Sequence, residues 1–125
     1  MKLKTLMLIG TVVAGVFGLA FVFLPGWVAA NYGITADAGL RYVNQVVGAS
    51  LVGIAVLCWF AKDTPQSEAR TAILPALFVF NGVALVVTLV AQLNGVMNAV
   101  GWFSVAIFLL FALGYAYFLW AKPAA

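Results

Sequence analysis

The chain of 125 residues contains no histidine, one cysteine and only three acidic residues. Histidine is the commonest ligand of zinc and copper and the usual axial ligand of haem, so its absence argues against all three kinds of site. Cys58 alone cannot form a disulfide within the chain, and three acids are few for a carboxylate metal site. We therefore expect neither a metal nor another cofactor.

Charged residues are also scarce, since Asp, Glu, Lys and Arg make up 7% of the chain whereas 66% of it is hydrophobic. In a soluble domain about a quarter of the residues are charged. A bilayer, by contrast, accepts apolar surface on the outside of its helices. The basic residues lie almost wholly between the apolar runs and form no cluster that would suit a nucleic acid. The sequence thus predicts an integral membrane protein in contact with the lipid bilayer.

Catalytic motifs are missing as well. The sequence shows no nucleophile paired with a base, no glycine-rich phosphate loop and no metal-ligand spacing. No apolar run carries an Asp or Glu in its interior, which is the residue type that proton-coupled carriers need. We expect the protein not to be an enzyme.

Four apolar runs, at about residues 5–24, 40–60, 72–93 and 99–120, are each long enough to cross the ~30 Å hydrocarbon core as a helix. They predict an all-α fold, an integral membrane four-helix bundle with up-down-up-down topology and a single transmembrane domain over residues 1–125. The connection at residues 25–39 carries Trp27 and Tyr32, so we expect it to lie along the membrane interface.

The first run has an alternative interpretation as a cleaved signal peptide, because lysines precede it and residues 28–30 resemble a cleavage site. A signal core has roughly 7 to 15 apolar residues, and this run is longer. We expect the first span to be retained. Thr35 and Thr64 are the expected N-caps of the second and third helices.

The cations predict the orientation. Five of the six fall on one side of the membrane, and these are Lys2, Lys4, Lys62, Arg70 and Lys122, with Arg41 on the other side. Cytoplasmic loops carry the excess of Lys and Arg. We therefore expect both termini in the cytoplasm and the chain in a bacterial inner membrane.

Small residues mark the expected contacts between helices. Gly10, Ala14 and Gly18 recur every four residues in the first span, and this pattern lets membrane helices approach closely. The glycine richness common to membrane helices is the alternative explanation. Gly48 and Gly53 offer similar room in the second span.

Asn81 in the third span shares a helical face with Thr88 and Gln92. Such a polar stripe either packs against another helix or lines a ligand site, and we favour packing.

The candidate site for a ligand or partner consists of the polar residues predicted near the non-cytoplasmic end, which are Arg41, Asn44, Gln45, Gln92 and Asn98. Arg41 follows Asp37 by four residues. It is therefore either an interfacial side chain paired with that acid or part of a site for an anion or a polar headgroup. Asn98 also suits the N-cap of the fourth helix.

Four features, spread over the whole chain, can be compared with a known family. Pro25 closes the first run, Leu40 and Arg41 open a glycine-bearing second run, a short charged loop follows Trp59, and residues 94–102 join the last two runs. In these features the chain resembles the broad DoxX-like set of small four-helix bacterial membrane proteins. Some members of that set are subunits of membrane redox complexes that deliver electrons to quinone, so the resemblance implies an accessory role.

The function that these patterns favour is a non-enzymatic accessory subunit or a binder of a lipid- or quinone-type ligand, partnered by another membrane subunit or a second copy. The alternative is a small transporter or channel. A channel needs a continuous polar path, and residues 54–60 and 108–119 in the cytoplasmic halves of the spans offer almost none.

Overall fold

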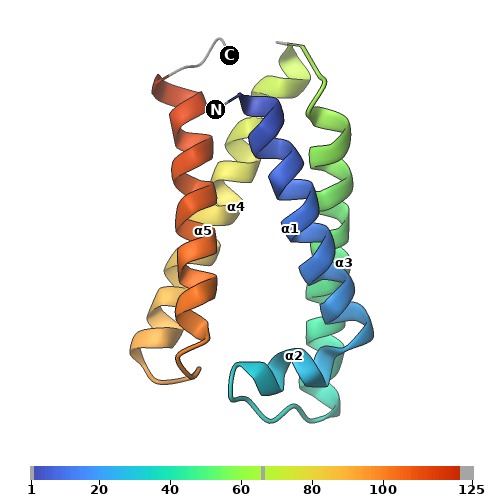
Figure 1. Ribbon diagram of the computed structural model, residues 1–125, viewed down its shortest axis with the longest axis vertical. Coiled ribbons are helices and arrows are strands. Elements are labelled where there is room, and N and C mark those ends of the chain that lie inside the picture. The colour runs from blue at the N-terminus through green and yellow to red at the C-terminus, as the bar shows by residue number, and fades with distance from the viewer. Residues whose placement is uncertain (1, 66, 122–125) are drawn as a thin grey trace. The chain divides into compact units, whose positions relative to one another are not determined.

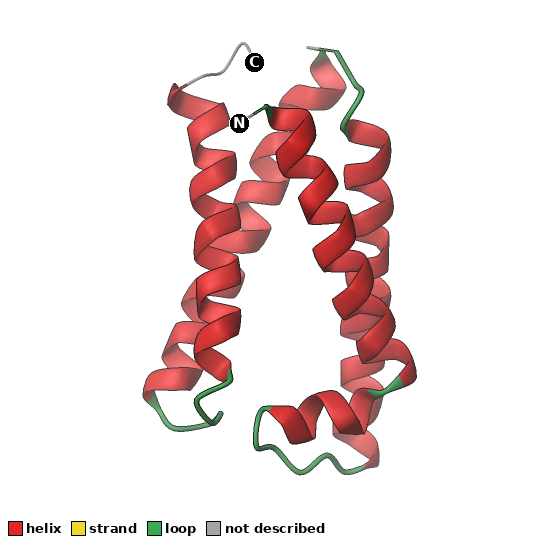
Figure 2. Ribbon diagram, in the orientation of Figure 1, coloured by secondary structure: helices red, strands yellow, loops and turns green. Residues whose placement is uncertain are grey.

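A computed structural model of the chain describes residues 2–65 and 67–121. In these residues the regular structure is entirely helical, with five α-helices, a π-helical segment and no strand (Figure 2). Four stretches are long and apolar enough to cross a membrane, namely Leu3–Phe23, Ala38–Ala61, Glu68–Leu93 and Gly101–Trp120. The all-α fold and the four spans predicted from the sequence are confirmed.

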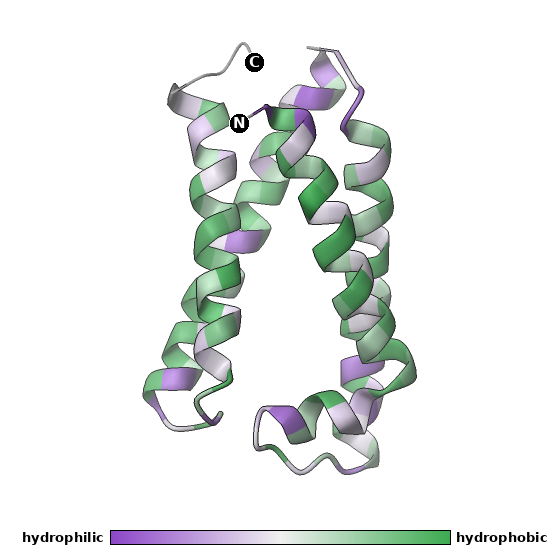
Figure 3. Ribbon diagram, viewed as in Figure 1, coloured by the Kyte–Doolittle hydropathy of each residue, from purple (hydrophilic) through white to green (hydrophobic). Residues whose placement is uncertain are grey.

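The chain divides into two compact units, which are described separately. Residues 4–62 hold α1 (Leu3–Phe23) except for its first residue, together with α2 (Pro25–Asn31) and α3 (Ala38–Ala61). The unit that begins at Asp63 holds α4 (Glu68–Leu93), α5 (Gly101–Ala116) and the π-helix η1 (Tyr117–Ala121). Hydrophobic residues cover most of the length of the four long helices, as expected for segments that lie in lipid (Figure 3).

The helix ends differ from the sequence prediction in their caps. Asp37, not Thr35, is the N-cap of α3, and its Oδ1 accepts a hydrogen bond of 2.8 Å from the Leu40 amide. Ser67, not Thr64, is the N-cap of α4, and its Oγ accepts from the Arg70 amide at 3.3 Å. An N-cap oxygen must reach the first free amides of its own helix, and each observed cap directly precedes the first helical residue.

In the first unit, α1 and α3 cross where Gly18 faces Gly48. A Cβ atom added to Gly48 would lie 2.7 Å from the carbonyl oxygen of Gly18, and one added to Gly18 would lie 2.9 Å from the backbone nitrogen of Val52. Backbone therefore lies against backbone at this point, with no room for a side chain on either helix. The short helix α2 runs across one end of this hairpin and contacts α3 (Figure 1).

The second unit is an antiparallel hairpin of α4 and α5 that is held by aromatic side chains. The rings of Phe78 on α4 and Trp120 on η1 pack edge to face with centroids 5.0 Å apart, and those of Phe80 and Phe108 do so at 6.3 Å. Helix α4 continues through Pro75. The fourth span begins at Gly101 rather than residue 99, and the chain winds as a π-helix from Tyr117 to Ala121.

Candidate functional site

The candidate site lies at the end of the first unit where α2 meets α3. Pro25 stands at the first position of α2, where its missing N–H costs no hydrogen bond. Helix α2 buries Val28 and Ala29, with exposed fractions of 5% and 4%, and leaves Trp27 61% exposed. A helix with one buried face and an outward tryptophan suits the headgroup level of a bilayer.

Helix α2 ends in a Schellman motif. The amides of Gly33 and Ile34 donate to the carbonyls of Ala30 and Ala29, respectively, both at about 3 Å. Gly33 has a φ of 76°, the left-handed conformation that glycine adopts without a steric penalty. The chain therefore turns back sharply after α2 and reaches α3 by a short loop.

This turn encloses an open hollow with a volume of about 530 Å³. Its walls are α2, the loop after it and the first turn of α3, and the lining residues are Gly26, Ala30, Gly33, Ile34, Thr35, Ala36 and Arg41. Arg41 is the one charged residue among them. Of the five candidate site residues named from the sequence, it is the one that lines the hollow.

The Arg41 side chain is exposed and passes over Gly26, where a Cβ atom would lie 3.6 Å from its Nε atom. Within residues 2–65 and 67–121, its guanidinium group has neither a carboxylate in ion-pairing distance nor a hydrogen-bond acceptor. The ion pair between Asp37 and Arg41 that the i+4 spacing allows is not formed, because the Asp37 carboxylate points to the amide of Leu40. The guanidinium is therefore left to an external partner or to solvent.

Asn44 and Gln45 have a different task from Arg41. The Asn44 amide nitrogen donates to the carbonyl of Pro25 at 3.2 Å, and the Gln45 amide nitrogen donates to the carbonyl of Val22 at 3.1 Å. The Val22 carbonyl lies in the last turn of α1, where carbonyls lack an intrahelical donor, whereas the Pro25 carbonyl opens α2. The two side chains thus tie the junction of α1 and α2 to α3, and they position the wall of the hollow without lining it.

The remaining candidates, Gln92 and Asn98, belong to the second unit. The Gln92 amide nitrogen donates to the backbone carbonyl of Asn98 at 3.1 Å, and the Asn98 Oδ1 accepts from the Val100 amide at 3.0 Å. Both side chains therefore shape the turn between α4 and α5, and Asn98 is not the predicted N-cap of the fourth helix, since Val100 holds that position without a side-chain cap. Gly95, with a φ of 74°, completes that turn.

The side-chain oxygen of Gln92 is buried and has no hydrogen-bond partner in the described part of the chain. It packs against Gly101, where a Cβ atom would overlap it. A C–H···O contact from the glycine Cα is the weak interaction that such a geometry offers. A flipped amide would place this oxygen against the Asn98 carbonyl, so the orientation of the side chain follows from its one strong hydrogen bond.

The residues predicted to pack helices are distributed as follows. Gly18 and Gly48 lie at the crossing of α1 and α3, whereas Gly53 has no atom within 4 Å of its Cβ position. Gly10 is buried and Ala14 is half-buried. Asn81 is 7% exposed, and its amide nitrogen donates to the Leu77 carbonyl in the same helix at 2.8 Å.

Sequence reasoning missed most of the hollow because it treated residues 25–39 as one interfacial connection. A signal for a short helix was present, since Pro25 stands at a helix start and Gly33 follows at a helix end.

No protein-family model matches the chain, and neither a curated protein nor a solved structure is significantly similar to it. The function must therefore be argued from the site itself.

Proposed function

We propose that this chain is a non-enzymatic membrane protein that binds the polar head of a lipid- or quinone-type amphiphile in the hollow beside Arg41. The observation that carries the proposal is an exposed arginine that lines a hollow and has no acidic partner among the described residues. An arginine near the end of a membrane helix reaches the interface at little cost, so its position needs no buried counter-ion. It is available for a ligand.

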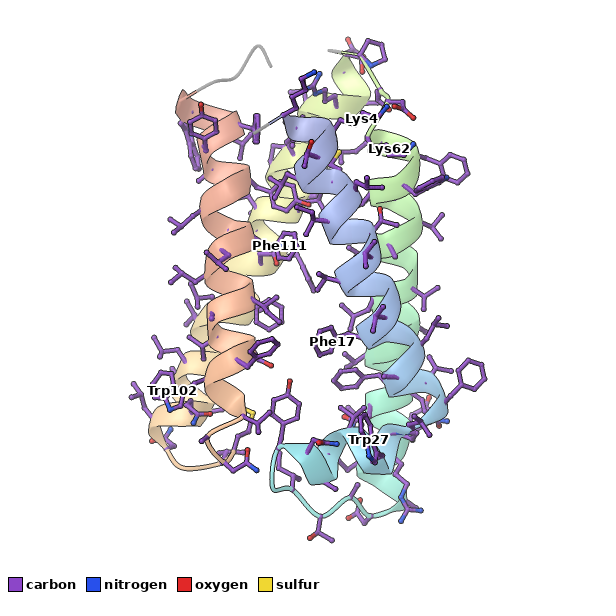
Figure 4. The ribbon with its side chains drawn as sticks, viewed as in Figure 1. Lys4, Phe17, Trp27, Lys62, Trp102 and Phe111 are labelled. Carbon is purple, nitrogen blue, oxygen red and sulfur yellow. The ribbon has the colours of Figure 1, made fainter. Side chains whose placement is uncertain are left out.

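The level at which the hollow lies in the membrane supports an amphiphilic ligand. Exposed aromatic residues lie near both ends of α3, Tyr42 at one and Trp59 at the other, and their separation of 17 positions corresponds to about 26 Å of helix. This length is close to the ~30 Å of the hydrocarbon core. Figure 4 shows Trp27 and Lys62 at opposite ends of the first unit. Arg41 then lies at headgroup level.

The surface next to the hollow suits an apolar tail. Ala30, Ile34 and Ala36 are apolar residues of its lining, and Trp27, which follows the lining residue Gly26 on α2, is 61% exposed. A ligand with its head at Arg41 would lay its chain along these residues. A water-soluble ligand would make no use of them.

Purification in a mild detergent tests the proposal. Amphiphiles retained by the protein are extracted and quantified by mass spectrometry for the wild type, Arg41→Gln and Lys62→Gln. Lys62 is a matched control, because it is a cation at the other end of α3 and its Nζ lies 4.1 Å from the centre of the Trp59 ring. We expect a loss in Arg41→Gln at unchanged thermal stability and little change in Lys62→Gln. A wild type that retains no amphiphile would refute the proposal.

The same purification bears on the proposed accessory role. A membrane subunit or a second copy that remains bound would support it, and the resemblance to the DoxX-like set is its remaining support. Flux measured after reconstitution addresses the transporter alternative, for which we expect no activity.

We also propose an orientation with both termini in the cytoplasm of a bacterial inner membrane, on the strength of the cation count. Lys122, one of the five cations on that side, lies outside the described residues. Reporter fusions after residue 125 and within the loop that joins α3 to α4 should both report the cytoplasm, and an insertion at Gly33 should report the outside. A cytoplasmic result at Gly33 would overturn the orientation.

A further inference from the structure

We infer that the hollow selects an anionic phosphate group, and specifically the phosphodiester of an anionic phospholipid. The inference rests on the proposed function and names the class of head group. It follows from the kinds of hydrogen-bonding group that the hollow presents. The hollow presents several hydrogen-bond donors, one of which is positively charged, and no acidic side chain.

The donors come from Arg41 and from the loop that precedes α3. A guanidinium group offers five N–H donors in a planar arrangement that fits two oxygens of a phosphate. Thr35 adds a hydroxyl group. Thr35 and Ala36 both line the hollow, and their backbone amides have no acceptor within the described residues. An oxyanion would satisfy several of these donors together.

The lack of acidic side chains lining the hollow also favours an anionic ligand. No Asp or Glu is among its lining residues. The nearest acid in sequence is Asp37, whose Oδ1 caps α3 through the Leu40 amide. A cationic choline or ethanolamine group would therefore find no counter-charge in the hollow, whereas an anion meets Arg41. This contrast favours anionic over zwitterionic phospholipids.

The area beside the hollow distinguishes a lipid phosphate from a free one. The apolar lining residues Ala30, Ile34 and Ala36 and the exposed Trp27 beside Gly26 give an acyl chain an apolar surface that inorganic phosphate cannot use. We therefore expect the phosphate to be bound as part of a lipid.

Native mass spectrometry of the full chain with defined lipids tests the inference. Dioleoyl-phosphatidylglycerol and dioleoyl-phosphatidylcholine have the same acyl chains and differ in head-group charge. We expect the wild type to bind the anionic lipid at least about fivefold more tightly, which is the effect of one surface cation near an anionic phosphate. Arg41→Gln should abolish the preference, and Arg41→Lys should keep part of it, because lysine retains the charge but not the planar donors.

Two further variants separate a built site from general attraction. Ala30→Leu fills the hollow and keeps every charge, so it should weaken binding of the anionic lipid without unfolding the exposed end of α2. Lys62→Gln removes one charge far from the hollow and should keep the preference. Equal loss in Lys62→Gln and Arg41→Gln would mean that net charge alone attracts the lipid, and this would overturn the inference.

The remaining outcomes are equally decisive. Equal affinity of the wild type for the two lipids would overturn the selectivity and leave the proposed binding of amphiphiles intact. If no amphiphile of any head group binds, the proposed function itself fails. Binding of inorganic phosphate by a wild type that shows no lipid preference would overturn the assignment to a lipid.

Discussion

Replacing Gly48 by alanine tests the crossing of α1 and α3 most directly. The new Cβ would lie 2.7 Å from the Gly18 carbonyl oxygen and 2.8 Å from both Phe21 Cβ and Val22 Cγ2. The first of these atoms belongs to the backbone and cannot move aside as the tip of a side chain can. The two helices must therefore separate.

The size of the effect follows from these distances. Ordinary van der Waals contact begins at 3.4 Å, so α1 and α3 must move apart by about 0.7 Å at the crossing. A gap of 0.5–1 Å forfeits roughly a quarter to a half of each dispersion contact that it opens. Overpacking of this kind costs about 1–3 kcal/mol, and the higher helix propensity of alanine returns up to about 1 kcal/mol. We expect Gly48→Ala to destabilise the protein by about 1–2 kcal/mol.

Unfolding by sodium dodecyl sulfate in mixed micelles, followed by circular dichroism, measures this change. Gly53→Ala is the matched control on the same helix, because nothing lies within 4 Å of its Cβ position. It should be neutral or slightly stabilising. The double variant Gly18→Ala with Gly48→Ala should cost less than the sum of the single changes, since both open the same crossing. A Gly48→Ala variant as stable as Gly53→Ala would refute the close approach of the helices.

Three other changes have defined outcomes in the same unfolding experiment. Asp37→Ala removes the N-cap of α3 and should cost about 1 kcal/mol, whereas Asp37→Asn, which keeps a capping oxygen, should be nearly silent. Gln45→Ala breaks the hydrogen bond to Val22 and should cost about 0.6 kcal/mol, with Ser50→Ala as the control because its hydroxyl bonds within its own helix. Gly101→Ala drives a methyl group into the Gln92 side chain and should cost about 1–3 kcal/mol; no loss would show that this turn is looser than described.

The sequence alone determined that lipid surrounds the helices, how many spans there are and about where each span begins and ends. Apolar runs of this length with so few charges suit lipid, and in lipid they must be helices because each backbone group is then paired inside its own segment. That property belongs to each run separately, so no knowledge of its neighbours was needed. The exit from α2 was in principle readable too, because Gly33 needs a positive φ wherever the rest of the chain lies.

The tertiary structure decided which of the equivalent residues are used. Gly48 and Gly53 look alike in the sequence, yet α3 meets α1 at Gly48 and leaves Gly53 open, because two crossing helices touch closely at only one level. Asp37 and Arg41 have the spacing of an ion pair, but the cap of α3 takes the carboxylate and leaves the arginine without it. Asn44 and Gln45 likewise acquire their role from carbonyls at the junction of α1 and α2, about twenty residues away. Such choices depend on where one segment lies against another, and residue patterns within a single helix do not contain that information.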